Sequence, residues 1–230
     1  MFSIIMPLDI GRLEQFRNTK RIYEQYLQPK EFIIPTRTEF QIARYMDYHK
    51  LMKDVKIVPY QTEEGFNPAK ALNLGVRNAK YDQIIITSPE VKPLTDVLDQ
   101  LEELKGKNIV CQVFDETENG DTSFSLVNHG FRSGSPAFYF LAMFNKADIE
   151  KINGWDEEFM KGYAYEDDDF GARWNRASLP FEIHEEIQAI HQYHPRSETI
   201  PDGAAINFSR FASNNEAGVI KCINGLNSLS

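Results

Sequence analysis

Short apolar runs alternate with amphipathic stretches through the first half of the chain. Four runs have the length and β-branched content of buried strands, and they cover residues 2–6, 31–34, 55–59 and 83–87. The stretches between them have the spacing of one-sided helices, and they cover residues 12–27, 38–52, 67–79 and 94–104. Four strand–helix units in succession predict a largely parallel sheet with helices on both faces. Ligands of such sheets bind beyond the carboxyl ends of the strands.

The pattern changes after about residue 105. The predicted elements are strands at 109–114, 122–127, 137–144 and 181–193 and helices at 145–152 and 166–177. Asn119-Gly120 is a turn signal that joins the first two of these strands. After residue 197 the periodicity is weak and predicts one helix with a loose end. We therefore expect a single domain over 1–200, followed by a C-terminal extension over 201–230.

Composition narrows the class of protein. The chain has 230 residues, 42% of them hydrophobic, which is enough for one domain core. The net charge is −9 and no dense Lys/Arg run is present, so we expect no nucleic-acid partner. Cys111 and Cys222 lack CxxC spacing, which argues against a disulfide scaffold, and Cys111 is expected to be a buried apolar residue. No apolar run approaches the roughly 18 residues of a membrane span, so the expected location is the cytoplasm.

The most distinctive segment of the chain is acidic. It combines GWDEEF at residues 154–159 with EDDDFG at 166–171, and it puts seven carboxylates into fourteen residues. The dipole of a helix favours acidic residues in its first turn by roughly 0.3–1 kcal/mol each, which accounts for one or two of them. Four adjacent carboxylates, Glu166 to Asp169, still need a cation, a hydrogen-bond network or open solvent. A solvated helix start and a chemical site therefore both remain open.

Two further groups of polar residues follow predicted strands. Glu90 comes directly after the buried strand at 83–87, at an edge suited to a divalent cation that prefers oxygen ligands. His191 and His194 lie three residues apart at the end of the last predicted strand, where one imidazole can face a metal. Each of these residues also has an ordinary interpretation, as a loop residue or a hydrogen-bonded histidine.

In order and spacing, these motifs resemble those of the GT-A nucleotide-sugar glycosyltransferases. The resemblance covers about residues 2–200. It is to the family 2 enzymes in particular and, in the C-terminal motif, to the β-1,4-galactosyltransferase type. Its most specific part is GWDEEF at 154–159 with YEDDDFGARW at 165–174, and NPAKALNLG at 67–75 adds a weaker match. It implies a Rossmann-like, mostly parallel α/β sheet with a smaller β region on the acceptor side. Residues 1–105 would be the nucleotide-binding half and 106–200 the acceptor and catalytic half.

The resemblance implies an inverting transfer of a sugar to a hydroxyl, with loss of a nucleoside diphosphate. Asp167 matches the general base, and Glu166 matches the neighbour that binds hydroxyls. The residues matched to the nucleotide and donor are Pro7, Asp9, Arg37, Glu39, Lys70 and Ser88. Trp155, Asp168 and Arg132 match the sugar or acceptor side. Core packing remains open for Trp155, as does a plain surface loop for Arg132.

The metal motif departs from the family pattern. Where the family has Asp-x-Asp, this chain has Ser88-Pro89-Glu90, which removes one carboxylate. The resemblance implies Mn²⁺ or Mg²⁺ held by Glu90 and one of His191 and His194, with diphosphate and water as the other ligands. The implied partners are a nucleoside-diphosphate sugar, with a UDP-sugar favoured, and a glycan or a lipid-linked acceptor met at the membrane surface.

Three other functions compete with a transferase. The missing first Asp motivates a binding module that holds a nucleotide sugar or glycan without turnover. A sugar nucleotidyltransferase shares the strand–helix start but needs a basic, glycine-rich phosphate loop, which PLDIGR at residues 7–12 does not provide. A glycosidase needs two carboxylates at a set separation, and the order of motifs argues against it.

Overall fold

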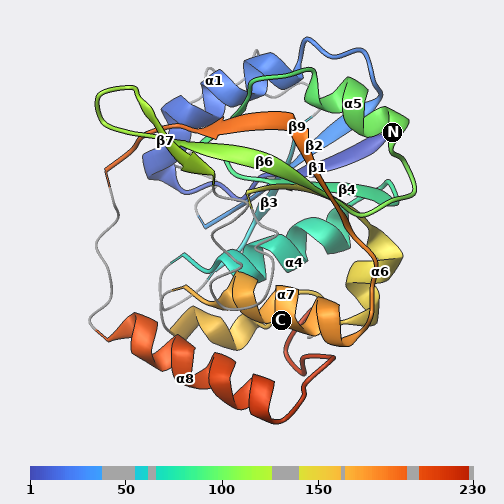
Figure 1. Cartoon of the computed structure of the whole chain (residues 1–230), viewed down its shortest axis with the longest axis vertical. Coiled ribbons are helices and arrows are strands. Elements are labelled where there is room, and N and C mark those ends of the chain that lie inside the picture. The colour runs from blue at the N-terminus through green and yellow to red at the C-terminus, as the bar shows by residue number, and fades with distance from the viewer. Residues whose placement is uncertain (38–54, 62–65, 126–139, 162–163, 196–201, 228–230) are drawn as a thin grey trace.

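A computed structural model describes residues 1–37, 55–61, 66–125, 140–161, 164–195 and 202–227. Within these ranges nine strands form one mixed sheet (Figure 1). The strands are β1 (Phe2–Ile5), β2 (Lys30–Thr36), β3 (Val55–Pro59), β4 (Gln83–Thr87), β5 (Val91–Pro93), β6 (Ile109–Glu116), β7 (Thr122–Ser125), β8 (Leu141–Asn145) and β9 (Glu182–His191). The helices are α1 (Leu13–Tyr23), α4 (Pro68–Asn78), α5 (Val97–Glu103), α6 (Lys146–Lys151), α7 (Glu166–Arg176) and α8 (Gly203–Glu216), with short 3₁₀ turns η1 (Ile10–Arg12) and η3 (Glu157–Lys161).

The strand order β3-β2-β1-β4-β8-β6-β9-β5 divides the sheet into two parts. β3, β2, β1 and β4 are parallel, as their spacing with helices predicted. β8 then enters antiparallel between β4 and β6, and β6 runs parallel to β9. The α/β class predicted from the sequence is confirmed.

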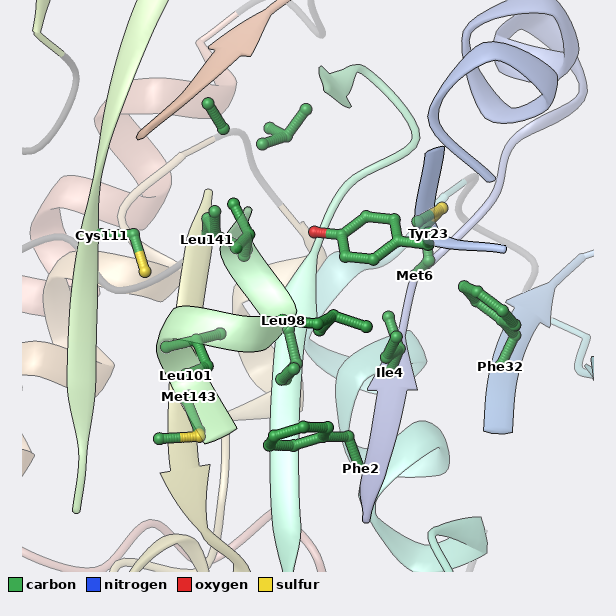
Figure 2. Close-up of a cluster of buried hydrophobic side chains, with 14 of the residues drawn as sticks. Phe2, Ile4, Met6, Tyr23, Phe32, Leu98, Leu101, Cys111, Leu141 and Met143 are labelled. Carbon is green, nitrogen blue, oxygen red and sulfur yellow. The ribbon is translucent and has the colours of Figure 1, made fainter. Parts of the chain in front are cut away.

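Two hydrophobic cores lie on opposite faces of the sheet. Because side chains alternate along a strand, Phe2, Ile4 and Met6 face α1 and α5, whereas Ile5 faces α4. Figure 2 shows the first core, where Tyr23 of α1 and Leu98 of α5 lie among the strand side chains, which include Phe32 of β2. The second core holds the buried side of α4 and α7 (Figure 1). Burying one side chain of this size is worth about 1.5–3 kcal/mol, so each face fixes the helices that cover it.

The start of α4 follows from its sequence. Asn67 caps the helix by accepting a hydrogen bond from the Lys70 backbone N–H, and Pro68 takes the first helical position. Gly75 lets the helix approach β1 closely, because a Cβ there would lie 2.3 Å from Ile5 Cγ2. This packing brings α4 near enough to the sheet for its polar face to reach the acidic segment.

Several predicted elements differ from the structure. The helix predicted at 38–52 and part of the strand at 137–144 lie outside the described residues. β5 was not predicted, because Val91–Pro93 is short and ends in proline. The loose end predicted after the last helix is wrong for residues 217–227. That segment packs back on the domain, with the Glu157 N–H donating to Asn224 O at 2.8 Å and the Leu226 N–H to Asn153 O at 2.8 Å.

The helices of the described ranges are all too short or too polar to cross a bilayer. The two cysteines lie inside the fold. Burial raises the pKa of the Cys111 thiol and raises that of Cys222 to about 11, so neither is a reactive thiolate. The prediction of Cys111 as a buried apolar residue is confirmed.

Candidate active site

The carboxyl ends of β1, β2 and β4 form one edge of the sheet. The segment after β1 carries Pro7 and Asp9, and β2 is followed by Arg37, whose Nη2 lies 3.6 Å from Asp9 Oδ2. The structure therefore brings together two residues that were predicted separately as nucleotide ligands. Tyr60 was missed by the sequence analysis. It follows β3, and its hydroxyl donates to Asn67 O at 3.4 Å. Arg37 and Asp9 lie close enough for their charges to act on the pKa of Tyr60, in opposite directions.

Ser88 and Lys70 lie on the same side of the fold but make few contacts. Ser88 follows β4, and its Oγ is buried without a hydrogen-bond partner among the described residues. Lys70 lies in the first turn of α4. Glu39 and Arg132, which were also predicted as site residues, lie outside the described residues.

A charged cluster forms where β4, β5, β6 and β9 end. Glu90 Oε1 accepts a hydrogen bond from Arg12 Nε at 2.5 Å and lies 3.9 Å from His194 Nε2. His191 Nδ1 lies 3.0 Å from Asp115 Oδ1, and the His191 ring meets the His194 ring at 5.2 Å between centroids. Arg12 and Asp115 carried no sequence signal, because they come from elements remote from Glu90 along the chain. Pairing of β5 with β9 creates the cluster by placing Val91 opposite His191.

Burial lowers the pKa of His191, although the Asp115 carboxylate acts in the opposite direction. A neutral His191 that donates from Nδ1 to Asp115 presents the lone pair of Nε2. A cavity of about 420 Å³ lies at this end of the sheet. Its lining residues are Asp115, Glu116, Thr117, His191, Tyr193 and His194. A second cavity, of about 500 Å³, lies between α1 and α5, away from the predicted site residues.

The cluster satisfies the predicted cation site only in part. The described residues contain no group of three His, Cys, Asp or Glu side chains arranged around one metal position. Two ligands at about 2.1–2.4 Å from one cation lie roughly 3–4 Å apart, and both the Glu90–His194 pair and the Asp115–His191 pair have such a separation. Arg12 shares the same Glu90 oxygen, so a cation there would have to displace or accompany the guanidinium.

The first half of the acidic segment is fastened to α4. Asn73 Oδ1 accepts from the Trp155 N–H at 2.9 Å, and Asn73 Nδ2 donates to Trp155 O at 2.8 Å and to Glu157 Oε1 at 2.9 Å. Arg77 Nη2 lies 3.2 Å from the same Glu157 oxygen. Gly154 is left-handed at φ 69°, and a Cβ there would lie 2.3 Å from Asn73 Oδ1. The two motifs on which the resemblance rests are therefore parts of one hydrogen-bonded unit.

Trp155 is a correction to the sequence prediction. Its side chain is 1% exposed, and its ring stacks on Phe170 with centroids 4.1 Å apart and planes at 7°. Both faces of the ring are thus inside the second core and unavailable to a sugar. The open alternative, core packing, is the one that the structure shows.

The four carboxylates in the second half of the segment differ in burial. Asp169 and Arg173 are both fully buried and paired at 2.6 Å, and Asn214 Nδ2 donates to the other Asp169 oxygen at 2.8 Å. Asp169 therefore holds α7 to α8. Glu166, Asp167 and Asp168 remain at the helix start, where Asp167 is 8% exposed and its two neighbours are half-buried.

Burial raises the pKa of the Glu166 carboxyl, and the charge of Asp168 raises it further. The Glu166 backbone N–H acts in the opposite direction but less strongly. A carboxyl that keeps its proton to higher pH can donate a hydrogen bond as well as accept one. Glu166 is half-buried and Asp167 is 8% exposed, so the two carboxyl groups differ in burial although they are adjacent in sequence.

The parallel nucleotide-side strands, the antiparallel strands that follow, and the Glu-Asp start of α7 give the fold of GT-A glycosyltransferases. The crystal structure of S. aureus TarS 1–349 in complex with UDP-GlcNAc superposes with a TM-score of 0.68 at 13% identity, over 92% of this chain and 65% of that one. The complex of TarS 1–349 with UDP gives 0.67 at 12% identity, over 98% and 67%. The full TarS structure gives 0.64 at 13% identity, over 93% of this chain and 39% of that one.

This chain therefore spans between two fifths and two thirds of the solved structures that it resembles. A family model described as the N-terminal domain of galactosyltransferase matches residues 128–196, which include α7 and the acidic segment. A search of curated proteins by sequence found no match.

Proposed function

We propose that this chain is a nucleotide-sugar glycosyltransferase that transfers a sugar to a hydroxyl group of its acceptor. The observation that carries the proposal is the set of Glu166, Asp167 and Asp168 at the start of α7, within the galactosyltransferase-like segment. The neighbouring fold holds UDP in one solved structure and UDP-GlcNAc in another, which supports a UDP-sugar as donor.

The proposed transfer inverts the configuration at the anomeric carbon. Asp167 takes the proton from the acceptor hydroxyl as its oxygen attacks, and the nucleoside diphosphate leaves from the opposite face. A base placed in this way typically accelerates a reaction by about 10²–10⁴-fold. Glu166 binds a sugar hydroxyl through its carboxyl group, and Asp168 faces the acceptor. The acceptor is proposed to be a glycan or a lipid-linked sugar, with Arg132 as a further contact.

The donor is proposed to lie along the carboxyl edge of β1, β2 and β4. Asp9 and Arg37 face the nucleoside, with Pro7, Lys70 and Ser88 nearby and Glu39 as a further contact. Glu90 with His194 or His191 would hold a Mn²⁺ or Mg²⁺ ion, which supplies positive charge beside the departing diphosphate. Arg12 lies on the same Glu90 oxygen and brings a second positive charge to that place.

A thermal-shift panel tests donor class and metal use together. Ligands that bind only the folded state raise its apparent stability by RT ln(1 + [L]/Kd), so about 100 Kd of ligand adds about 2.7 kcal/mol. We expect UDP and UDP-sugars to raise Tm more than other nucleotides, and Mn²⁺ to enlarge the shift. Sugar transfer is then measured as the release of UDP in the presence of glycan acceptors. No shift with any nucleotide, with or without Mn²⁺, would contradict the proposal.

A binding module without turnover is the second candidate. Ser88 stands where the family has a carboxylate, and Glu90 is already paired with Arg12. Both features weaken the expected cation site. This candidate predicts a UDP-dependent Tm shift together with no release of UDP across a broad acceptor panel. Measurable transfer or donor hydrolysis rules it out.

A further inference from the structure

The C-terminal helix α8 lies against α7 and η3, beside the acidic segment (Figure 1). Its buried face carries Gly203, Asn207 and Phe211. Phe211 packs with Phe159 and Ala172, as expected of an apolar contact. Asn207 is different, because it is polar, 1% exposed and placed at the centre of this contact.

Asn207 joins the two ends of the loop that leads into α7. Its Nδ2 donates to Phe159 O at 2.8 Å and to Ala164 O at 2.7 Å. Both partners are carbonyl oxygens, so the amide must present its NH₂ group to them, and its orientation is fixed. Water has little access to the Asn207 amide or to its hydrogen bond with Phe159 O, so that carbonyl group depends on Asn207 for a partner.

The backbone that Asn207 holds is in an uncommon conformation. Ala164 and Tyr165 have φ of 65° and 72°, the left-handed region that residues other than glycine rarely adopt. Such conformations persist where the surroundings over-determine them. Tyr165 O accepts the first hydrogen bond of α7, from the Asp169 N–H at 3.0 Å. The geometry of this turn therefore sets the direction in which α7 starts.

Two rings of α8 hold the same turn from the side. The Tyr165 ring lies 5.5 Å from Phe208 and 5.8 Å from Phe211 between centroids, the latter nearly parallel at 24°. The hydrogen bonds from Asn207 and these ring contacts act on the residues immediately before Glu166 and Asp167. A change in the turn would therefore move both carboxylates.

We propose that Asn207 is a positioning residue for the transfer reaction. Its side-chain amide fixes the left-handed turn at Ala164–Tyr165 and so aims Asp167 and Glu166 at the acceptor hydroxyl. The proposal rests on the proposed function of these carboxylates. It assigns to the C-terminal helix a part in catalysis rather than a purely structural attachment.

The test compares three variants on α8. Asn207→Ala removes both hydrogen bonds, and Asn207→Asp keeps the shape but puts a carboxylate against two carbonyl oxygens. Asn215→Ala is the matched control, because Asn215 accepts from Arg176 Nη1 at the other end of the helix and does not touch the turn. A misplacement of about 1 Å near reacting groups costs roughly 10²-fold in rate. We expect kcat to fall about 10–100-fold in Asn207→Ala and further in Asn207→Asp, with KM for the donor within about twofold.

Asn215→Ala should lower kcat less than threefold. Equal losses in the Asn207 and Asn215 variants, in proportion to a fall in Tm, would overturn the proposal, because they indicate a stability effect alone. Full kcat in folded Asn207→Ala would overturn it as well.

A second measurement does not depend on activity. Backbone hydrogen exchange should rise at residues 164–169 in Asn207→Ala and stay unchanged there in Asn215→Ala. Unchanged exchange in this turn would contradict the positioning role. A wild-type chain that neither binds nucleotide sugars nor transfers sugar, yet shows the exchange effect, would overturn the proposed function and leave Asn207 as the residue that sets the turn.

Discussion

The two halves of the acidic segment, residues 154–159 and 166–171, contain the same residue types, but their carboxylates have different surroundings. In the first half, Asp156 and Glu157 are buried against Arg210 and Arg77, and Asn73 ties the backbone to α4. In the second half, Asp169 is buried and paired with Arg173, and Glu166 to Asp168 stand at a helix start that follows a left-handed turn. The buried carboxylates that pair with an arginine, Asp156, Glu157 and Asp169, hold the fold. Those at the strained helix start form the proposed site.

The largest effect is expected from Asp167→Asn. The amide keeps the size of the side chain but cannot take a proton, so transfer should fall by about 10²–10⁴-fold. Tm and the Tm shift with UDP should change little, because the variant retains the packing of α7. Turnover is measured as release of UDP. A variant that keeps wild-type turnover would place the base elsewhere.

The next effect is on stability and comes from the paired carboxylate. Arg173→Met leaves Asp169 buried and without its cation, which typically costs about 3–5 kcal/mol. Arg173 Nη1 also donates to Ile152 O and Gly154 O, so the turn before Trp155 loses two contacts. Urea denaturation measures the free energy of unfolding. Arg210→Met is the control and should cost less, because Arg210 is half-exposed and Asp156 keeps the hydrogen bond from the Glu158 N–H. Equal losses of unfolding free energy in the two variants would contradict the distinction between the Asp169–Arg173 and Asp156–Arg210 pairs.

Asn73→Ala tests the connection between the two family motifs. It removes three buried hydrogen bonds and leaves the Trp155 N–H without this partner, at a cost of about 1–3 kcal/mol. Asn78→Ala is the matched control, because Asn78 Nδ2 donates only within α4, to Leu74 O. Thermal unfolding of both variants provides the measurement. If Asn78→Ala lowers the stability more than Asn73→Ala does, the hydrogen bonds from Asn73 to Trp155 and Glu157 contribute less to stability than their geometry indicates.

The smallest effect concerns pH and Glu166. A carboxyl whose pKa is raised on folding binds its proton more tightly in the folded state, so its stabilising contribution is full at acid pH and is lost as pH rises through the folded pKa. Glu166→Gln should therefore gain stability relative to wild type between about pH 4 and neutral pH. Denaturation curves at several pH values measure the difference. In an Asp168→Asn background the gain should shrink, because Asp168 contributes to the shift; a gain that is independent of pH would contradict the environment assigned to Glu166.

Much of the fold followed from periodicity. The parallel strands, the helix at 67–79 and the helix opened by Glu166 were predicted because each depends on residues close together in sequence. Trp155 was open between a sugar platform and the core, because the sequence cannot show what covers an aromatic ring. α8 was expected only as a weak helix, and the importance of Asn207 could not be foreseen, since its partners Phe159 and Ala164 lie more than 40 residues away.

The sequence by itself determined the α/β class, the order of the elements and the acidic segment, because apolar spacing and local caps are written into neighbouring residues. Only the tertiary structure decided that Asp156 pairs with Arg210 of α8 and Glu157 with Arg77 of α4, because these partners are distant in sequence, whereas Asp169 and Arg173 lie four residues apart in α7. It also decided that Glu90 meets Arg12 and His194, through the pairing of a three-residue strand with β9. Contacts of this kind depend on how distant elements pack, and no local pattern records them.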